Sequence, residues 1–327
     1  MRNHHLDIAK GLLLCMVVAY HVMGKADPTV LAGGNAAFNL IASFFMQGFF
    51  LISGYLFAPK AQDVNSVARK CLTWWAICLG TMPLYWAWGT YLGNLMSIFQ
   101  MPLWQFSGWT IEHGFLGLVT WYLWTLALCV LLVYGCEGMT RRWPRLPLWA
   151  VLLAFVVAVN ALPFGLFGVT QLGWYGLFFV VGYLWRRYSV RCPGWASYAA
   201  LGIFPLLAGL FGGMADFQSV DYGQFGFVNL RASVLAGQWP LIGASLLMAL
   251  TGSAAVYGTS RLVGADSAGA VVFGWLGRHS LPLYLGHILF VGVTPWPLVS
   301  GMIALAVPAL LVVVASGVRR KQWASSV

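Results

Sequence analysis

Three ionisable side chains lie in the first apolar stretch of the chain: Asp7, Lys10 and His21. On one continuous helix, Lys10 and His21 are about three turns and ~16 Å apart along the axis, and they share nearly the same face. A cation at one end of such a helix suits the phosphates of a nucleotide-bearing donor. A neutral imidazole deep in the bundle suits a general base for a hydroxyl nucleophile. The spacing therefore favours a functional pair, and the alternative is a snorkelling lysine with a hydrogen-bonded core histidine.

The second apolar stretch contains the pair Ser53-Gly54. Small residues let helix backbones approach closely, and the serine leaves a hydroxyl group in an apolar setting. Both a packing role and a chemical role fit this pair.

A group of aromatic residues follows in the region expected on the outer side of a membrane. It consists of Trp104, Phe106, Trp109, Phe115, Trp121 and Tyr122. Aromatic faces pack well against the C–H faces of sugars, which fits a carbohydrate acceptor. Interfacial belt anchors and core packing are the alternative reading.

The elements that must position these residues follow from composition. Hydrophobic residues make up 60% of the 327 residues and charged residues only 8%, and the mean hydropathy is +0.79. A soluble domain is closer to ~25% charged. Lipid requires every backbone amide to be satisfied internally, so long apolar runs indicate helices. The sequence therefore predicts an all-α, polytopic transmembrane helix bundle that forms a single domain over residues 1–327.

We expect about ten spans. They are predicted at 6–24, 38–58, 71–92, 115–136, 147–163, 169–185, 195–213, 238–260, 279–294 and 297–318. With the N-terminus in the cytoplasm, every lysine and arginine except Lys25 and Arg231 falls on the cytoplasmic side. This is the positive-inside asymmetry of a multi-pass protein of a bacterial-type inner membrane, with both termini cytoplasmic. The net charge of +10 is thereby explained without a nucleic-acid partner.

Several classes of site lack their signature. None of the six cysteines forms a CxxC pair, and no metal-ligand spacing occurs, so no metal is predicted. The chain contains no GxSxG elbow, P-loop or dinucleotide glycine pattern in a strand–turn–helix context. These observations disfavour a soluble-type hydrolase and an ATP-driven pump.

Taken in order, the motifs resemble those of the membrane acyltransferase-3 family, whose members O-acylate cell-surface glycans and some smaller acceptors. The landmarks occur in the family's order and cover essentially the whole chain. They are Leu6-Asp7…Lys10-Gly11…His21, Phe49-Phe50-Leu51-Ile52-Ser53-Gly54-Tyr55, the basic residues before a third span that contains Pro83 and Tyr85, Trp121-Tyr122-Leu123-Trp124, the 178–184 segment and the 276–287 segment. The Leu-Asp-Ile-Ala-Lys-Gly start is closest to the branch that acetylates sugar hydroxyls.

The resemblance implies roles for individual residues. The family's intramembrane histidine falls on His21, and its basic partner falls on Lys10. The family usually has arginine there, and lysine keeps the charge but lacks the planar fork for a bidentate contact. The resemblance extends to Ser53-Gly54 and to His287, which either binds substrate or hydrogen-bonds between helices.

The implied reaction uses acetyl-coenzyme A as the acyl donor, with its phosphates near Lys10, Arg69, Lys70 and Arg278. His21 either deprotonates the acceptor hydroxyl or is itself transiently acylated. The acceptor is a glycan or a lipid-linked sugar, and a succinyl group in place of acetyl stays open.

Supporting roles complete this interpretation. Ser53, Tyr55 or a backbone amide near Gly54 would stabilise the oxyanion. Trp121, Tyr122, Tyr55 and His287 are the predicted substrate-binding residues. Glu112, in the outer loop 93–114, is the candidate carboxylate to orient the His21 imidazole.

Two other classes of function fit the composition. A transporter or flippase for a glycolipid or small solute would use a polar cavity without needing a thioester. A non-catalytic membrane component of a polysaccharide assembly complex would need neither. His21 discriminates between them, because only the acyltransferase requires its imidazole.

Overall fold

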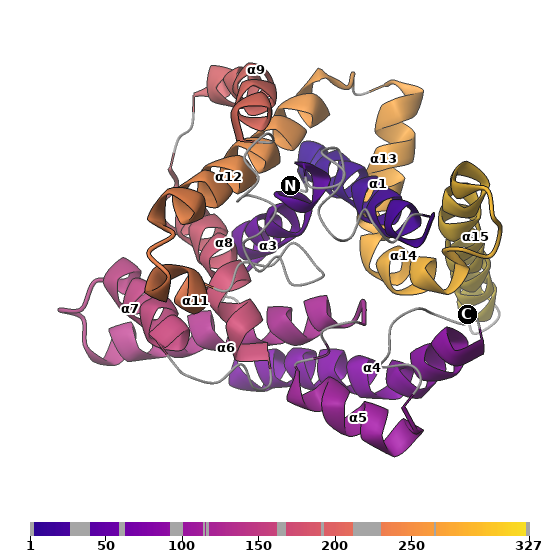
Figure 1. The fold of residues 1–327 in the computed structure, drawn as a ribbon, viewed down its shortest axis with the longest axis horizontal. Coiled ribbons are helices and arrows are strands. Elements are labelled where there is room, and N and C mark those ends of the chain that lie inside the picture. Colours follow the sequence, from indigo (N-terminus) through magenta and orange to yellow (C-terminus); the bar gives the residue numbers. More distant parts are fainter. Residues whose placement is uncertain are drawn as a thin grey trace. The chain divides into compact units, whose positions relative to one another are not determined.

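The computed structural model describes residues 3–26, 40–58, 63–91, 101–113, 115, 118–161, 168–190, 193–211, 230–264 and 266–324. Within these ranges the regular structure is helical and no strand occurs (Figure 1). The predicted all-α class is therefore confirmed.

Five helices are long and apolar enough to cross a membrane. They are α1 (His4–Ala26), α6 (Trp121–Arg142), α9 (Gly194–Phe211), α12 (Trp239–Leu262) and the Pro297–Ser316 part of α15 (Pro297–Ala324). Shorter apolar helices occupy Leu40–Leu56, Leu148–Asn160 and Ser280–Phe290. The protein is thus a membrane protein, while the ten-span count and the cytoplasmic termini stay predictions.

One predicted connection contains a helix that was not expected. The outer loop expected at 93–114 contains helix α5 (Leu103–Glu112), which begins directly after Pro102. Proline has no N–H to donate, so it suits the start of a helix, where the first N–H groups have no intrahelical partner. Residues 92–100 of this connection lie outside the described part of the chain.

The chain packs as two compact units. Unit 1 comprises residues Met1–Met46, Pro193–Ser219 and Leu247–Val327, and unit 2 comprises Gln47–Cys192 and Val220–Leu246. Each unit is described by itself below.

In unit 1, α1 packs along α13 (Ala268–Arg278) and also contacts α14 (Ser280–His287) and α15 (Figure 1). The α1–α13 contact is close because glycines face backbone from both sides. A Cβ added to Gly11 would overlap the carbonyl of Phe273, and one added to Gly277 would overlap the carbonyl of Asp7. Small residues allow this approach, as is common where membrane helices pack.

The far end of α1 packs on the last part of unit 1. Val18 and Val22 form a buried group with Val291 and Ala304. Val291 directly follows the short 3-10 helix η5 (Ile288–Phe290), which continues α14. This apolar group fixes α14 against α1 and so determines where the end of α14 lies.

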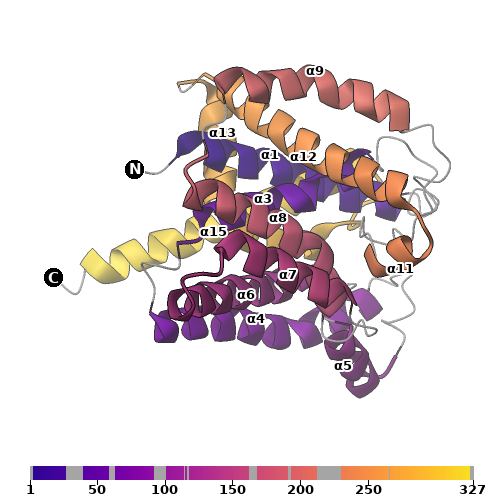
Figure 2. The same ribbon diagram turned by 90° about the vertical axis from the view of Figure 1, so that its left-hand side faces the viewer.

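In unit 2, α6 packs against α4 (Val64–Tyr91), α7 (Leu148–Ala161) and α8 (Val169–Arg187) (Figure 2). Helix α3 (Phe45–Leu56) meets α8 through a second glycine pair. A Cβ on Gly54 would overlap the carbonyl of Phe179, and one on Gly182 would overlap the carbonyl of Leu51. The close backbone approach predicted for Ser53-Gly54 is confirmed at Gly54. The short helix α11 (Leu230–Leu235) contacts α7 and α8.

Candidate functional site

Two histidines meet in unit 1. His21 comes from the last part of α1 and His287 from the last residue of α14, with ring centroids 5.1 Å apart and planes inclined by 44°. His287 is fully buried, and His21 is half-buried. The packing of α14 on α1 therefore joins two residues that are 266 positions apart in the sequence.

The hydrogen bond of His287 assigns its tautomer. Its Nδ1 lies 2.5 Å from the carbonyl oxygen of Tyr284, one helical turn earlier. A carbonyl oxygen can only accept, so Nδ1 carries the proton and Nε2 of the neutral ring carries a lone pair. Nε2 is buried and has no hydrogen-bond partner within the described ranges. The imidazole is thus held in place at one nitrogen and able to accept a proton at the other.

Aromatic rings surround this histidine pair. The ring of Tyr20 meets His21 edge-on at 5.5 Å, and the ring of Tyr284 lies 5.6 Å from His287. An apolar, aromatic setting keeps an imidazole neutral, and only the neutral form is a base. The group that orients the His287 imidazole is the backbone carbonyl of Tyr284.

Lys10 lies near the other end of α1. Its ammonium group pairs with the buried Asp7 carboxylate at 3.1 Å, and 17% of the lysine side chain is exposed. The Asp7 backbone is the part of α1 that touches Gly277, and the next residue, Arg278, is exposed at the end of α13. The structure thus places two of the four predicted donor-binding cations on one packed helix pair, with Lys10 held by an acidic neighbour.

The other two predicted donor-binding cations belong to unit 2. Arg69 and Lys70 are exposed near the start of α4, and the Lys70 ammonium lies 4.9 Å from the centre of the Trp74 ring. A cation over an indole face is favourable.

Unit 2 also joins the predicted serine to a predicted aromatic residue. The hydroxyl groups of Ser53 and Tyr122 lie 3.0 Å apart. The Phe50 ring, one turn before Ser53, lies 5.0 Å from the Tyr122 ring and stacks on Trp121 at 6.1 Å. Ser53, Trp121 and Tyr122 thus belong to one aromatic group. Along the sequence, Ser53 and the two aromatic residues lie in separate motifs.

The remaining predicted residues of unit 2 lie elsewhere. Tyr55 is half-buried, its ring packs edge-on against Trp185 at 6.3 Å, and its carbonyl oxygen accepts a hydrogen bond from Arg186. Glu112 is exposed at the last residue of α5. Its predicted role in orienting His21 stays a prediction.

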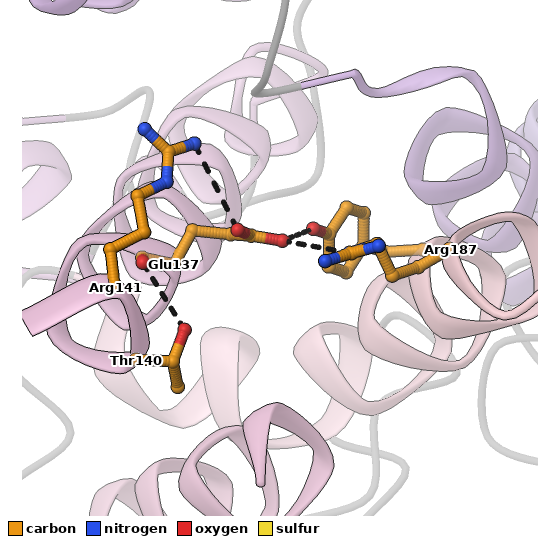
Figure 3. Close-up of polar contacts among 5 residues, drawn as sticks. Glu137, Thr140, Arg141 and Arg187 are labelled. Atoms are coloured by element: carbon orange, nitrogen blue, oxygen red, sulfur yellow. Dashed lines mark hydrogen bonds and ion pairs between the residues drawn. The ribbon is translucent and has the colours of Figure 1, made fainter. Parts of the chain in front are cut away.

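The structure shows one polar group that the sequence did not single out. Glu137 on α6 is 3% exposed. Its carboxylate accepts from the Tyr183 hydroxyl and from Nε of Arg187 at 3.3 Å, and it faces Arg141 at 3.9 Å (Figure 3). The available signal was an acidic residue directly after the predicted span 115–136, four positions before an arginine. Within the described ranges, no three His, Cys, Asp or Glu side chains gather as metal ligands would.

Comparison with known proteins identifies the family. The acyltransferase-3 model, described as an acyltransferase domain, matches residues 3–318. No curated protein and no solved structure matches the chain. The family match spans both units, and therefore covers both the histidine pair and the Ser53–Tyr122 contact. The chain belongs to the acyltransferase-3 family and is an acyltransferase of the membrane.

Proposed function

We propose that this acyltransferase moves an acetyl group from cytoplasmic acetyl-coenzyme A across a bacterial inner membrane to a hydroxyl group of a cell-surface or lipid-linked glycan. The family supplies acyl transfer in general. The observation that carries the proposal is the contact between His21 and His287, because two neighbouring imidazoles, of which His287 is buried, are suited to moving the proton that O-acylation releases.

In the direct route, His21 takes the proton of the acceptor hydroxyl as its oxygen attacks the thioester carbonyl. The C–O bond forms, the C–S bond breaks, and coenzyme A leaves as a thiolate that takes up the proton. Nε2 of His287 is the proton acceptor next to His21, since its Nδ1 already donates to Tyr284.

In the covalent route, a ring nitrogen of His21 attacks the thioester and forms an acyl-imidazole, and the coenzyme A thiolate leaves. The acceptor oxygen then attacks the acyl-imidazole, forms the ester and frees His21. Its hydroxyl proton passes to His287 and from there to the thiolate. The covalent route needs a base beside His21, because the acylated imidazole cannot take the proton, and the buried lone pair of His287 supplies one.

The remaining predicted site residues bind the donor, the acceptor and the oxyanion. Lys10, Arg278, Arg69 and Lys70 bind the phosphates of the donor. Trp121, Tyr122 and Tyr55 bind the sugar of the acceptor, and the Ser53 hydroxyl donates to the oxyanion. The Ser53–Tyr122 hydrogen bond supports this assignment, because it fixes the Ser53 hydroxyl at a site lined by aromatic rings.

The test uses inside-out membrane vesicles that carry wild type, His21→Ala or His279→Ala and receive radiolabelled acetyl-coenzyme A. His279 is the matched control, since its Nδ1 lies 3.0 Å from the carbonyl oxygen of Trp275, much as His287 contacts Tyr284. We expect label in glycan or glycolipid with wild type and His279→Ala only. Equal labelling with His21→Ala at matched protein levels would remove His21 from the mechanism. Absence of label with every protein, in vesicles shown to contain acceptor, would contradict the acetyl donor.

A further inference from the structure

We infer that Arg187, with Arg141 beside it, forms a phosphate-binding site at the basic ends of α6 and α8. This site lies in unit 2, is separate from the histidine pair, and deepens the proposed function by assigning a group that holds the phosphate of an anionic ligand. It rests on the proposed function only for the identity of that ligand.

A buried carboxylate organises the two arginines. Oε1 of Glu137 accepts from the Tyr183 hydroxyl and from Nε of Arg187, and Oε2 faces a terminal amino group of Arg141. Figure 3 shows the two guanidinium groups on either side of the Glu137 carboxylate. The side chain of Glu137 is 4% exposed. Removing a carboxylate from water costs several kcal/mol unless it is paired, so the arrangement holds Arg187 firmly in one orientation.

Part of the Arg187 side chain stays exposed to a ligand. The contact to Glu137 is made through Nε of Arg187. The side chain is 37% exposed, and that of Arg141 is 57% exposed. One carboxylate against two guanidinium groups leaves a net positive charge. A planar fork of two N–H groups matches two oxygens of a phosphate.

The neighbouring cations are already engaged. Arg186 donates to the backbone carbonyl oxygens of Tyr55 and Leu56 at the end of α3. The guanidinium group of Arg142 lies 5.9 Å from the centre of the Trp143 ring. Arg187 therefore differs from Arg186 and Arg142 in having a buried carboxylate as its partner.

Two ligands offer this chemistry. The phosphates of coenzyme A would approach from the side of the membrane where the positive-inside pattern places these helix ends. The phosphate of an anionic lipid headgroup is present at the same depth. The shared chemistry is a phosphate group that accepts two parallel N–H bonds, and the experiment separates the two sources.

The experiment uses the full-length protein in nanodiscs, as wild type, Arg187→Gln, Arg187→Lys and Arg142→Gln. In discs of zwitterionic phosphatidylcholine, calorimetry measures the Kd of coenzyme A. We expect Arg187→Gln to raise the Kd by about tenfold or more, the loss expected for a charge-assisted contact. Arg187→Lys keeps the pairing with Glu137 and should raise the Kd less. The control Arg142→Gln should stay within about twofold of wild type.

In discs that contain phosphatidylglycerol, mass spectrometry counts the anionic lipid retained by each variant after purification. Weaker coenzyme A binding by Arg187→Gln assigns the site to the donor. Unchanged coenzyme A binding with loss of retained phosphatidylglycerol assigns it to a lipid headgroup. If neither changes in Arg187→Gln, or in Arg187→Lys where the glutamine variant does not fold, the inference is overturned.

The inference and the proposed function fail in different ways. His21→Ala should bind coenzyme A as wild type does while transferring no acetyl group. Arg187-dependent binding without His21-dependent transfer would keep the phosphate site and remove the proposed mechanism. Transfer that depends on His21, with no effect of Arg187 on either ligand, would keep the proposed mechanism and remove the phosphate site.

Discussion

Replacing His287 by asparagine distinguishes the roles of its two ring nitrogens. The amide nitrogen of the shorter side chain can take the place of Nδ1 and donate to the Tyr284 carbonyl, which His287 contacts at 2.5 Å. The lone pair at Nε2, buried and without a partner in the described ranges, has no counterpart. The substitution therefore keeps the local hydrogen bond and removes the proposed proton acceptor beside His21.

The expected effect follows from the role of a base. Loss of a positioned general base lowers a rate by about 10²–10⁴-fold. At ~1.36 kcal/mol per tenfold, the barrier rises by about 3–5 kcal/mol. A His287 that only hydrogen-bonds between helices would instead lose part of its packing, with a cost in stability of about 1–2 kcal/mol and little effect on the rate.

The assay is the initial rate of acetyl transfer in inside-out vesicles at saturating acetyl-coenzyme A, normalised to the amount of folded protein. The matched control is His279→Asn, which keeps the contact to the Trp275 carbonyl and removes an imidazole that contacts no second histidine ring among the described residues. We expect the control to retain most of the activity. A His287→Asn rate within about threefold of wild type, with unchanged thermal unfolding, would refute the assignment of His287 as proton acceptor.

Three further predictions concern packing, acceptor and donor. Gly277→Ala should lower the free energy of unfolding by about 1–3 kcal/mol, because the new Cβ overlaps backbone of α1. The control is Gly80→Ala, whose new Cβ would have no atom within 4 Å and which should leave the Tm unchanged or higher. Equal Tm values for the Gly277→Ala and Gly80→Ala variants would contradict the close α1–α13 contact. Tyr122→Phe removes the hydrogen bond to Ser53. It should cost about 1 kcal/mol of stability and raise the KM for the acceptor, measured from acceptor saturation; an unchanged KM would leave Tyr122 a packing residue. Lys10→Gln should raise the KM for acetyl-coenzyme A several-fold while Lys10→Arg keeps it low, whereas a loss of stability without a KM change would make Lys10 only a partner for its acidic neighbour.

The membrane class and the helical fold could be predicted from composition alone. Apolar runs without charges must form helices in lipid, because the backbone amides have no water to bind. Helix α5, within the connection expected at 93–114, was not predicted.

Part of the candidate site could likewise be predicted from the sequence, and part could not. His21 and Lys10 could be found because both lie on one helix, where spacing alone fixes their separation. The pairing of Lys10 with Asp7 also follows from i, i+3 spacing. Glu137 and Arg141 offered the comparable i, i+4 signal, and its meaning depended on Arg187 and Tyr183 from another helix.

The sequence by itself determined the helical membrane class, the family motifs and the residues that carry ionisable groups into apolar helices. Only the tertiary structure decided which of these groups meet. His287 contacts His21 because α14 packs on α1, and its tautomer is set by a backbone carbonyl that any residue at position 284 would provide. The same holds for the Glu137 carboxylate between Arg141 and Arg187. Spacing constrains residues within one helix, whereas the partners of a side chain on other helices depend on packing. Glycines such as Gly11 and Gly277 make that packing close between α1 and α13.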